Sequence, residues 1–314
     1  MDHCIYCNTL YDHLTDEHIV PEGLGGNRVI KNASCKQCGD ATSRTELKVL
    51  RQSYGLWRMR AAYGIGLRRK KEKPKTMKLT ISSKDSRLIH ELPLGRSPVH
   101  LALPLLAVPS KITNGPRPSR VRVRGAHLYL RSTRKGHDNA VLESGTIHIK
   151  ERHYDHDFAK MIAKIGWAAW CNAYPGTISD AWLPDVIIGK QVAAGLFVGN
   201  ADYAVDGQPF APCLHSIHLG HCLGFGGVRI ALVRIHLFLQ LHPSPTYLAT
   251  VGVIRPDAVK TIKSDEWHLP FFGEIGEPMK SPLPKWLGTR IYSGGKPLKK
   301  TVVYKELKER GFVT

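Results

Sequence analysis

The sequence predicts a protein of the α+β class, in which a small N-terminal unit precedes a larger, mostly antiparallel domain. Three observations predict this organisation. Two Cys-x-x-Cys pairs lie within residues 1–40, short runs bounded by turns recur from about residue 77, and one strongly amphipathic segment spans residues 155–173. The chain has 314 residues, which is long enough for two domains. We place the small unit at residues 1–55, a basic linker at 56–78 and the larger domain at 79–314.

The small unit carries a cysteine pattern that is typical of a metal site. Cys4 and Cys7 form one pair, and Cys35 and Cys38 form the other. Two thiolates separated by two residues on a tight turn can bind one ion, and two such pairs complete a tetrahedral zinc site. A redox role is the alternative, but the βαβ pattern that surrounds a thioredoxin-like motif is absent here. We therefore expect a structural Zn²⁺ held by the four cysteines.

Between the two pairs, an acid and a histidine stand together in the segment DEHIVP, residues 16–21. The carboxylate of Glu17 can hold a hard divalent cation such as Mg²⁺. The imidazole of His18 titrates near neutral pH, so it can take a proton from water. Together such groups can hydrolyse a phosphodiester. Taken alone, the segment also fits a solvated turn with a surface histidine.

The order of these features closely resembles the HNH endonuclease family in its zinc-bridged ββα-metal form. The pattern runs from the first cysteine pair through residues 16–21 and the glycine-rich stretch 23–26 to the second pair, and it continues to Glu46. The resemblance covers about residues 4–47. It implies that His18 is the general base and that Glu17 helps to bind a catalytic Mg²⁺ or Mn²⁺. It also implies that the four cysteines bind zinc.

One position departs from the family pattern. The family commonly has His or Asn directly after the last cysteine, and that residue completes the metal site, whereas this chain has Gly39. Asp40 follows directly, and Glu46 lies seven residues after Gly39, two turns along the same helical face. Either acid could replace the missing ligand in a rearranged metal site. The alternative is that the module is catalytically impaired.

A large excess of basic residues points to a polyanionic partner. The chain has 45 Lys and Arg against 26 Asp and Glu, a formal net charge of +19. Basic surfaces gain affinity for nucleic acid by releasing condensed counterions. Residues 120–124 alternate as Arg-Val-Arg-Val-Arg, which fits either a nucleic-acid face or an ordinary exposed strand. The residues expected to contact nucleic acid are Arg68, Arg69, Lys70, Lys71, Arg120, Arg122 and Arg124.

The larger domain reads as short strands around one buried helix. Apolar residues of the segment 155–173 recur at helical spacing, and Asp155 and Asp157 stand where a helix begins. His215, His218 and His221 would alternate between the two faces of a strand, which argues against a metal site there. Strands are expected at 78–82, 99–108, 120–130, 214–223, 228–241 and 247–254, a hairpin turn at 224–227, and a short helix near 303–310.

These observations favour a metal-dependent endonuclease that hydrolyses DNA, or RNA, with residues 79–314 serving target recognition or regulation. A homodimer would suit the cutting of both strands. Restriction or defence is an expectation from the family alone. Two alternatives stay open: a zinc module that binds nucleic acid without cleaving it, and a ligand-sensing effector protein. No apolar stretch approaches the length of a membrane span and no secretory signal is recognised, so we expect a cytoplasmic location without membrane contact.

Overall fold

The fold is taken from a computed structural model. It describes residues 2–53, 55–57, 60, 76–82, 87–93, 99–113, 118, 120–131, 146–148, 154–191, 193–205, 214–224, 227–238, 244–262, 289–293 and 296–297.

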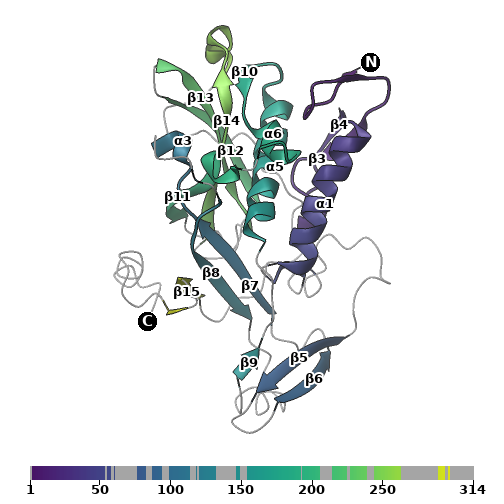
Figure 1. Ribbon diagram of the computed structural model, residues 1–314, viewed down its shortest axis with the longest axis vertical. Helices are drawn as coiled ribbons and strands as arrows, with labels where there is room; N and C mark the ends of the chain where they lie inside the picture. Colours follow the sequence, from purple (N-terminus) through teal and green to yellow (C-terminus); the bar gives the residue numbers. More distant parts are fainter. Residues whose placement is uncertain are drawn as a thin grey trace.

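The N-terminal unit has a ββα arrangement (Figure 1). Strand β3 (Thr15–His18) pairs antiparallel with β4 (Val29–Ser34), and helix α1 (Lys36–Gln52) follows β4 almost directly. The register of the two strands shifts between Thr15 and Glu17, so β3 is irregular where it carries the acidic residues. A second short pair, β1 (Asp2–His3) with β2 (Leu10–Tyr11), precedes them, and the turn η1 (Glu22–Leu24) joins β3 to β4.

An antiparallel sheet of five strands, counted over the described residues, forms the centre of the larger part of the chain (Figure 1). Its order is β10-β14-β13-β12, and β11 also pairs with β14. The bounds are β10 (Ile178–Ala181), β11 (Val198–Val205), β12 (Ser216–Leu223), β13 (Arg229–His236) and β14 (Ser244–Ile254).

Helix α5 (Asp155–Ala173) covers one face of this sheet. Asp155 and Asp157 lie in its first turn, where acidic side chains interact favourably with the helix dipole. The helix approaches the sheet closely at Gly166, because a Cβ at that position would lie 2.7 Å from the Cβ of Ala249. Nearly every side chain from Phe158 to Trp170 is buried, so α5 is a core helix of the protein.

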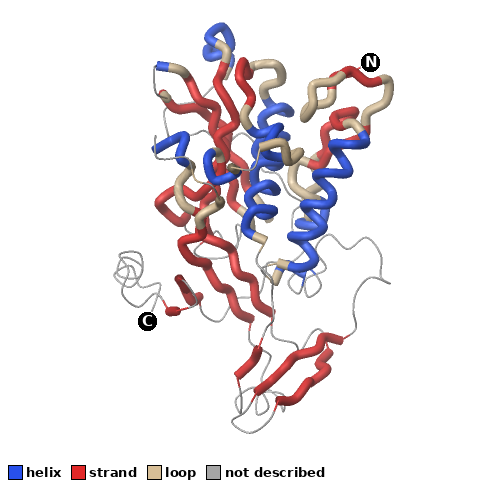
Figure 2. The backbone as a smooth tube through the Cα atoms, viewed as in Figure 1, coloured by secondary structure: helices blue, strands red, loops and turns tan. Residues whose placement is uncertain are grey.

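Two smaller antiparallel sheets complete the described structure (Figure 2). One has the order β16-β15-β8-β7 and the other the order β6-β5-β9. Their strands are β5 (Thr76–Ser82), β6 (Arg87–Pro93), β7 (Val99–Leu106), β8 (Val123–Arg131), β9 (Thr146–His148), β15 (Thr289–Ser293) and β16 (Lys296–Pro297). The short helical segments are α3 (Ser110–Thr113), α6 (Leu183–Ile187), η4 (Ala194–Leu196) and η6 (Pro256–Thr261).

The N-terminal unit and the central sheet share one continuous core. Buried residues of the unit, such as Tyr6 and Leu24, belong to the same apolar cluster as Phe158 of α5 and Tyr247 of β14. Helices α1 and α5 lie side by side, as Figure 1 shows. No helix in the described ranges is both long and apolar enough to cross a membrane.

The structure confirms the α+β class and the ββα unit. The helix expected at 155–173 has the same bounds as α5, and the strands β5, β7, β12, β13 and β14 overlap the expected ones. Strand β8 begins at Val123, three residues later than expected, and residues 122–124 are all exposed. The expected helix at 303–310 and the basic residues 68–71 lie outside the described residues.

Candidate functional site

The four cysteines of the two pairs form one compact cluster. Their sulfur atoms all lie within 4.8 Å of one another. The pair at 4 and 7 lies between β1 and β2, whereas Cys35 caps α1 and Cys38 is in its first turn. A tetrahedral Zn²⁺ with bonds of about 2.3 Å places its sulfur ligands about 3.8 Å apart, and Cys7 Sγ lies 3.9 Å from Cys35 Sγ. The donor set therefore fits the structural zinc expected from the sequence.

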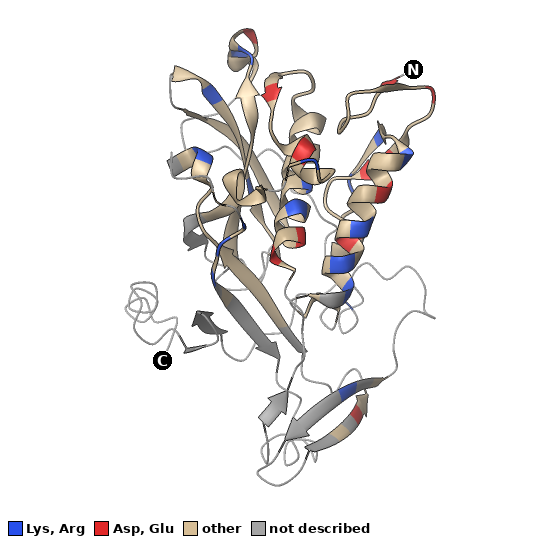
Figure 3. Ribbon diagram, in the orientation of Figure 1, with Lys and Arg blue, Asp and Glu red and all other residues tan. Residues whose placement is uncertain are grey.

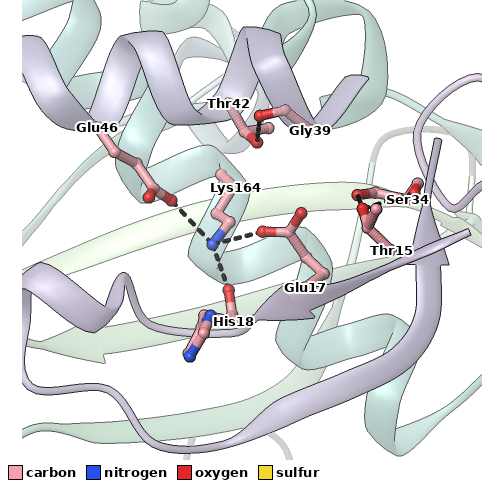
Figure 4. A network of polar contacts seen from close by, with 8 residues as sticks. All are labelled: Thr15, Glu17, His18, Ser34, Gly39, Thr42, Glu46 and Lys164. Carbon is pink, nitrogen blue, oxygen red and sulfur yellow. Dashed lines mark hydrogen bonds and ion pairs between the residues drawn. The ribbon is translucent and has the colours of Figure 1, made fainter. Parts of the chain in front are cut away.

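A buried ionic cluster joins the N-terminal unit to helix α5. The Nζ atom of Lys164 lies 2.7 Å from Glu17 Oε1 and 2.9 Å from Glu46 Oε1. The same ammonium donates a hydrogen bond to the carbonyl oxygen of His18. Figure 4 shows these three contacts converging on one nitrogen. The cluster therefore brings together residues of β3, α1 and α5.

Burial makes this cluster electrostatically strong. The side chain of Lys164 is 2% exposed, and those of Glu17 and Glu46 are 8% and 19% exposed. Burial disfavours the charged ammonium, but the carboxylates of Glu46 and Glu17 outweigh this effect and raise the pKa of Lys164. Burial, together with the negative charges of Glu17 and Glu46, also raises the pKa of the Tyr6 phenol. Lys164 is thus held as a cation between two acids.

Glu17 and Glu46 do not fit a divalent ion between them as they are arranged here. Each carboxylate has an oxygen within ion-pair distance of the Lys164 ammonium. The ammonium therefore already occupies the position between the two carboxylates. The gap between α1 and α5 beside Glu46 and Lys164 is too narrow for a water molecule. Mg²⁺ usually keeps several waters when it binds a protein. The expected catalytic Mg²⁺ or Mn²⁺ accordingly stays a prediction.

The two candidate replacements for the missing ligand at Gly39 have different surroundings. Glu46 lies beside Glu17 through their shared contact with Lys164. Asp40 is exposed and forms an ion pair of 3.0 Å with Lys36 on the surface of α1. At position 39, an added Cβ would lie 3.3 Å from Ser34 Oγ, so this part of α1 faces β4. Of these two residues, only Glu46 therefore lies beside Glu17 of β3.

His18 is half-buried at the end of β3. Its carbonyl oxygen faces Lys164, whereas its imidazole points away from the ammonium and the carboxylates (Figure 4). The neighbouring Asp16 is exposed and pairs with Lys31 at 2.6 Å. Lys31 holds the pKa of the Asp16 carboxyl below its usual value, with a smaller effect from His18. Glu17 and His18 therefore occupy different surroundings although they are adjacent in sequence.

A basic cleft of about 260 Å³ lies between α1, α5 and the end of α6. Basic residues of α1 and α5 line it, together with Asp157, and Figure 3 shows how Lys and Arg recur along these two helices. Lys48 pairs with Asp157 at 2.5 Å, which fixes one wall of the cleft. The basic side chains that line it are Arg44, Lys48 and Lys160.

The sequence did not point to Lys164 or to this cleft. Arg124 is exposed in β8, Arg120 and Arg122 are exposed just before that strand, and none of these three arginines, which were expected to contact nucleic acid, lines the cleft. A signal for Lys164 does exist in the sequence, because it is a lysine between Ala163 and Ile165 in an otherwise apolar stretch. Buried lysines are rare unless they are paired, so such a residue marks a partner elsewhere in the fold.

Comparison with known proteins bears directly on the N-terminal unit. Residues 4–53 match the HNH endonuclease family. This HNH-like module, as we call residues 4–53, spans about a sixth of the chain and contains the cysteine cluster, His18 and both acids of the Lys164 cluster. No curated protein and no solved structure matches the chain. The resemblance seen in the motifs is thereby confirmed for the HNH-like module.

Proposed function

We propose that the HNH-like module hydrolyses phosphodiester bonds of nucleic acid, with DNA as the substrate and His18 as the general base. The observation that carries this proposal is the family match over residues 4–53, within which the His18 motif and the cysteine cluster stand together. A family of nucleases implies a nucleic-acid substrate, and the net charge of +19 agrees with that class of partner.

The proposed reaction is a hydrolysis in which His18 moves one proton. Its imidazole takes a proton from a water molecule, and the water oxygen forms a bond to phosphorus. The bond from phosphorus to the leaving ester oxygen breaks, and that oxygen departs with the electron pair and is protonated by solvent. Arg44, Lys48 and Lys160 in the cleft between α1 and α5 would bind backbone phosphates and set the position of the substrate. Residues 79–314 would recognise the target or regulate cleavage.

Replacement of His18 by Ala tests this assignment. Loss of a general base typically lowers a rate by about 10²–10⁴-fold, so we expect the nicking of supercoiled plasmid to fall by that order. The assay is run with zinc-loaded full-length protein, with no added divalent ion and with Mg²⁺ or Mn²⁺. His13→Ala is the matched control, because His13 is an exposed histidine of the same module. Undiminished cleavage by His18→Ala would show that another group is the base.

A second candidate function is nucleic-acid binding without cleavage. Two observations favour it: Gly39 offers no metal ligand, and Lys164 takes the point between Glu17 and Glu46. Under this proposal the protein would retard labelled duplex DNA in every metal condition while leaving it uncut. Its affinity would fall steeply as salt is raised, because phosphate contacts release counterions. Cleavage that depends on His18 would contradict this second candidate.

A further inference from the structure

We infer that Lys164 permanently fills the catalytic cation position of the HNH-like module, so that the folded protein binds no divalent ion between Glu17 and Glu46. The inference concerns the site of the proposed nuclease, but it stands on cation binding and not on cleavage. Its basis is the arrangement of one ammonium and two carboxylates at the junction of β3, α1 and α5.

Lys164 has three oxygen neighbours within the protein. Its Nζ atom forms ion pairs with Glu17 Oε1 at 2.7 Å and with Glu46 Oε1 at 2.9 Å, and it donates a hydrogen bond to the carbonyl of His18. Two of these oxygens belong to carboxylates, which are also the ligands that a hard divalent ion prefers. The ammonium is therefore surrounded by protein oxygens in the way that a bound cation would be.

The surroundings prevent an ion from taking this place. Lys164 is 2% exposed, and the space beside it and Glu46 is too narrow for water. A divalent ion would have to displace the ammonium, which would then be buried without its partners. Burying an unpaired charge is strongly unfavourable. Helix α5 cannot withdraw easily either, because Phe158, Ile162 and Ile165 fix it in the core.

The cation between Glu17 and Glu46 comes from outside the HNH-like module. Lys164 belongs to α5, outside the matched residues 4–53, so a residue of the larger part of the chain completes the HNH-like module. The resemblance assigns Glu17 to a metal and leaves Gly39 without a ligand. In this chain, Glu46 and Lys164 supply an acid and a fixed positive charge at the same place. One explanation thus covers both the departure at Gly39 and the buried lysine: the ammonium of Lys164 supplies the positive charge, so no further metal ligand is needed at position 39.

Titration with Mn²⁺ followed by electron paramagnetic resonance tests the inference, using zinc-saturated full-length protein without nucleic acid. We expect wild-type protein and Glu17→Gln to bind Mn²⁺ equally weakly, because neither offers Glu17 to an ion. Lys164→Met should gain one Mn²⁺ site per chain, and adding Glu17→Gln to that variant should remove the site. Lys160→Met is the matched control, since Lys160 lies one turn earlier on the same helix, and it should gain no site.

Two results would overturn the inference. One is a Mn²⁺ site in wild-type protein that Glu17→Gln abolishes. The other is a folded Lys164→Met variant, as judged by circular dichroism, that gains no site. If Lys164→Met does not fold, the comparison of wild-type protein with Glu17→Gln still decides between the two arrangements. His18→Ala should leave Mn²⁺ binding unchanged, whereas it should lower plasmid nicking. A failure of the proposed nuclease function would therefore appear in the nicking assay and not in the Mn²⁺ titration.

Discussion

At the scale of single residues, the adjacent side chains of Glu17 and His18 have different surroundings because successive side chains of a strand point to opposite faces. Glu17 is buried against Lys164, whereas the imidazole of His18 points away from that ion pair. An acid that is buried and paired cannot also serve as an exposed ligand. The proton-transfer role proposed for His18 therefore does not depend on contact with Glu17.

The buried ion cluster makes Lys164 important for stability. Removing one partner of a buried ion pair leaves an uncompensated charge and typically costs about 3–5 kcal/mol. We expect Lys164→Met to lower the free energy of unfolding by that order in urea denaturation without divalent ions. Combining it with Glu17→Gln and Glu46→Gln should recover a large part of the loss, because the unpaired carboxylates are then gone. A single variant as stable as wild type would show that the cluster contributes little.

At the scale of elements, the cysteine cluster holds the turn between β1 and β2 against the start of α1. These elements are too short to build a core by themselves, and small units of this kind obtain folding free energy from a bound metal. The buried Cys4, Cys35 and Cys38 are also part of the main apolar cluster. The zinc site is therefore expected to stabilise the whole HNH-like module.

Zinc content checks this expectation. We expect about one zinc per chain by mass spectrometry of the metal, and Cys35→Ser should lower that content and reduce the melting temperature. Cys171→Ser is a suitable control, because Cys171 lies in α5 outside the four-cysteine cluster. Equal zinc content in wild-type protein and Cys35→Ser would contradict the assignment of the ligands.

At the scale of the whole molecule, His215 links the HNH-like module to the central sheet. The amide of Phe238 donates to His215 Nδ1 at 3.1 Å, so Nδ1 carries no proton. Nε2 is then the donor to the carbonyl of Leu24, at 2.7 Å. This pattern requires a neutral imidazole. Burial lowers the pKa of His215 to about 4, against the smaller opposing effect of the Leu24 carbonyl.

This histidine predicts a loss of stability in acid. The ordinary pKa of histidine, about 6.5, applies to the unfolded chain. The unfolded chain therefore binds more protons than the folded one between pH 6.5 and 4, and the free energy of unfolding falls as the pH falls through this window. The contribution of His215 is on the order of 1–3 kcal/mol. His218 and His236, with pKa values lowered by burial to about 4 and about 3, act in the same direction.

Urea denaturation at pH 7 and at pH 4.5 checks this prediction. His215→Gln retains a hydrogen-bond donor but cannot titrate, so its stability should fall less between the two pH values than that of wild-type protein. The exposed His13 supplies the control, as His13→Gln should behave like wild type. An identical loss of stability in His215→Gln would place the acid sensitivity in other groups.

The sequence by itself determined the features that depend on local spacing. Two Cys-x-x-Cys pairs predict a zinc site, and apolar residues at helical spacing predict α5 with its observed bounds. The order of the two cysteine pairs, residues 16–21 and the glycine-rich stretch likewise predicts the resemblance to the HNH endonuclease family, which the match over residues 4–53 bears out. Each of these features depends on residues that are close together in the sequence.

Only the tertiary structure determined that Lys164 pairs with Glu17 and Glu46. Lys164 is separated from Glu46 by more than a hundred residues, and no spacing rule connects positions so far apart. The same helical stripe that predicts α5 predicts burial, but not that one buried side chain is a cation between two acids. Their meeting depends on the packing of α1 against α5 over a shared core. The physical reason is that a buried ammonium is stable only where the complete fold supplies its counter-charges.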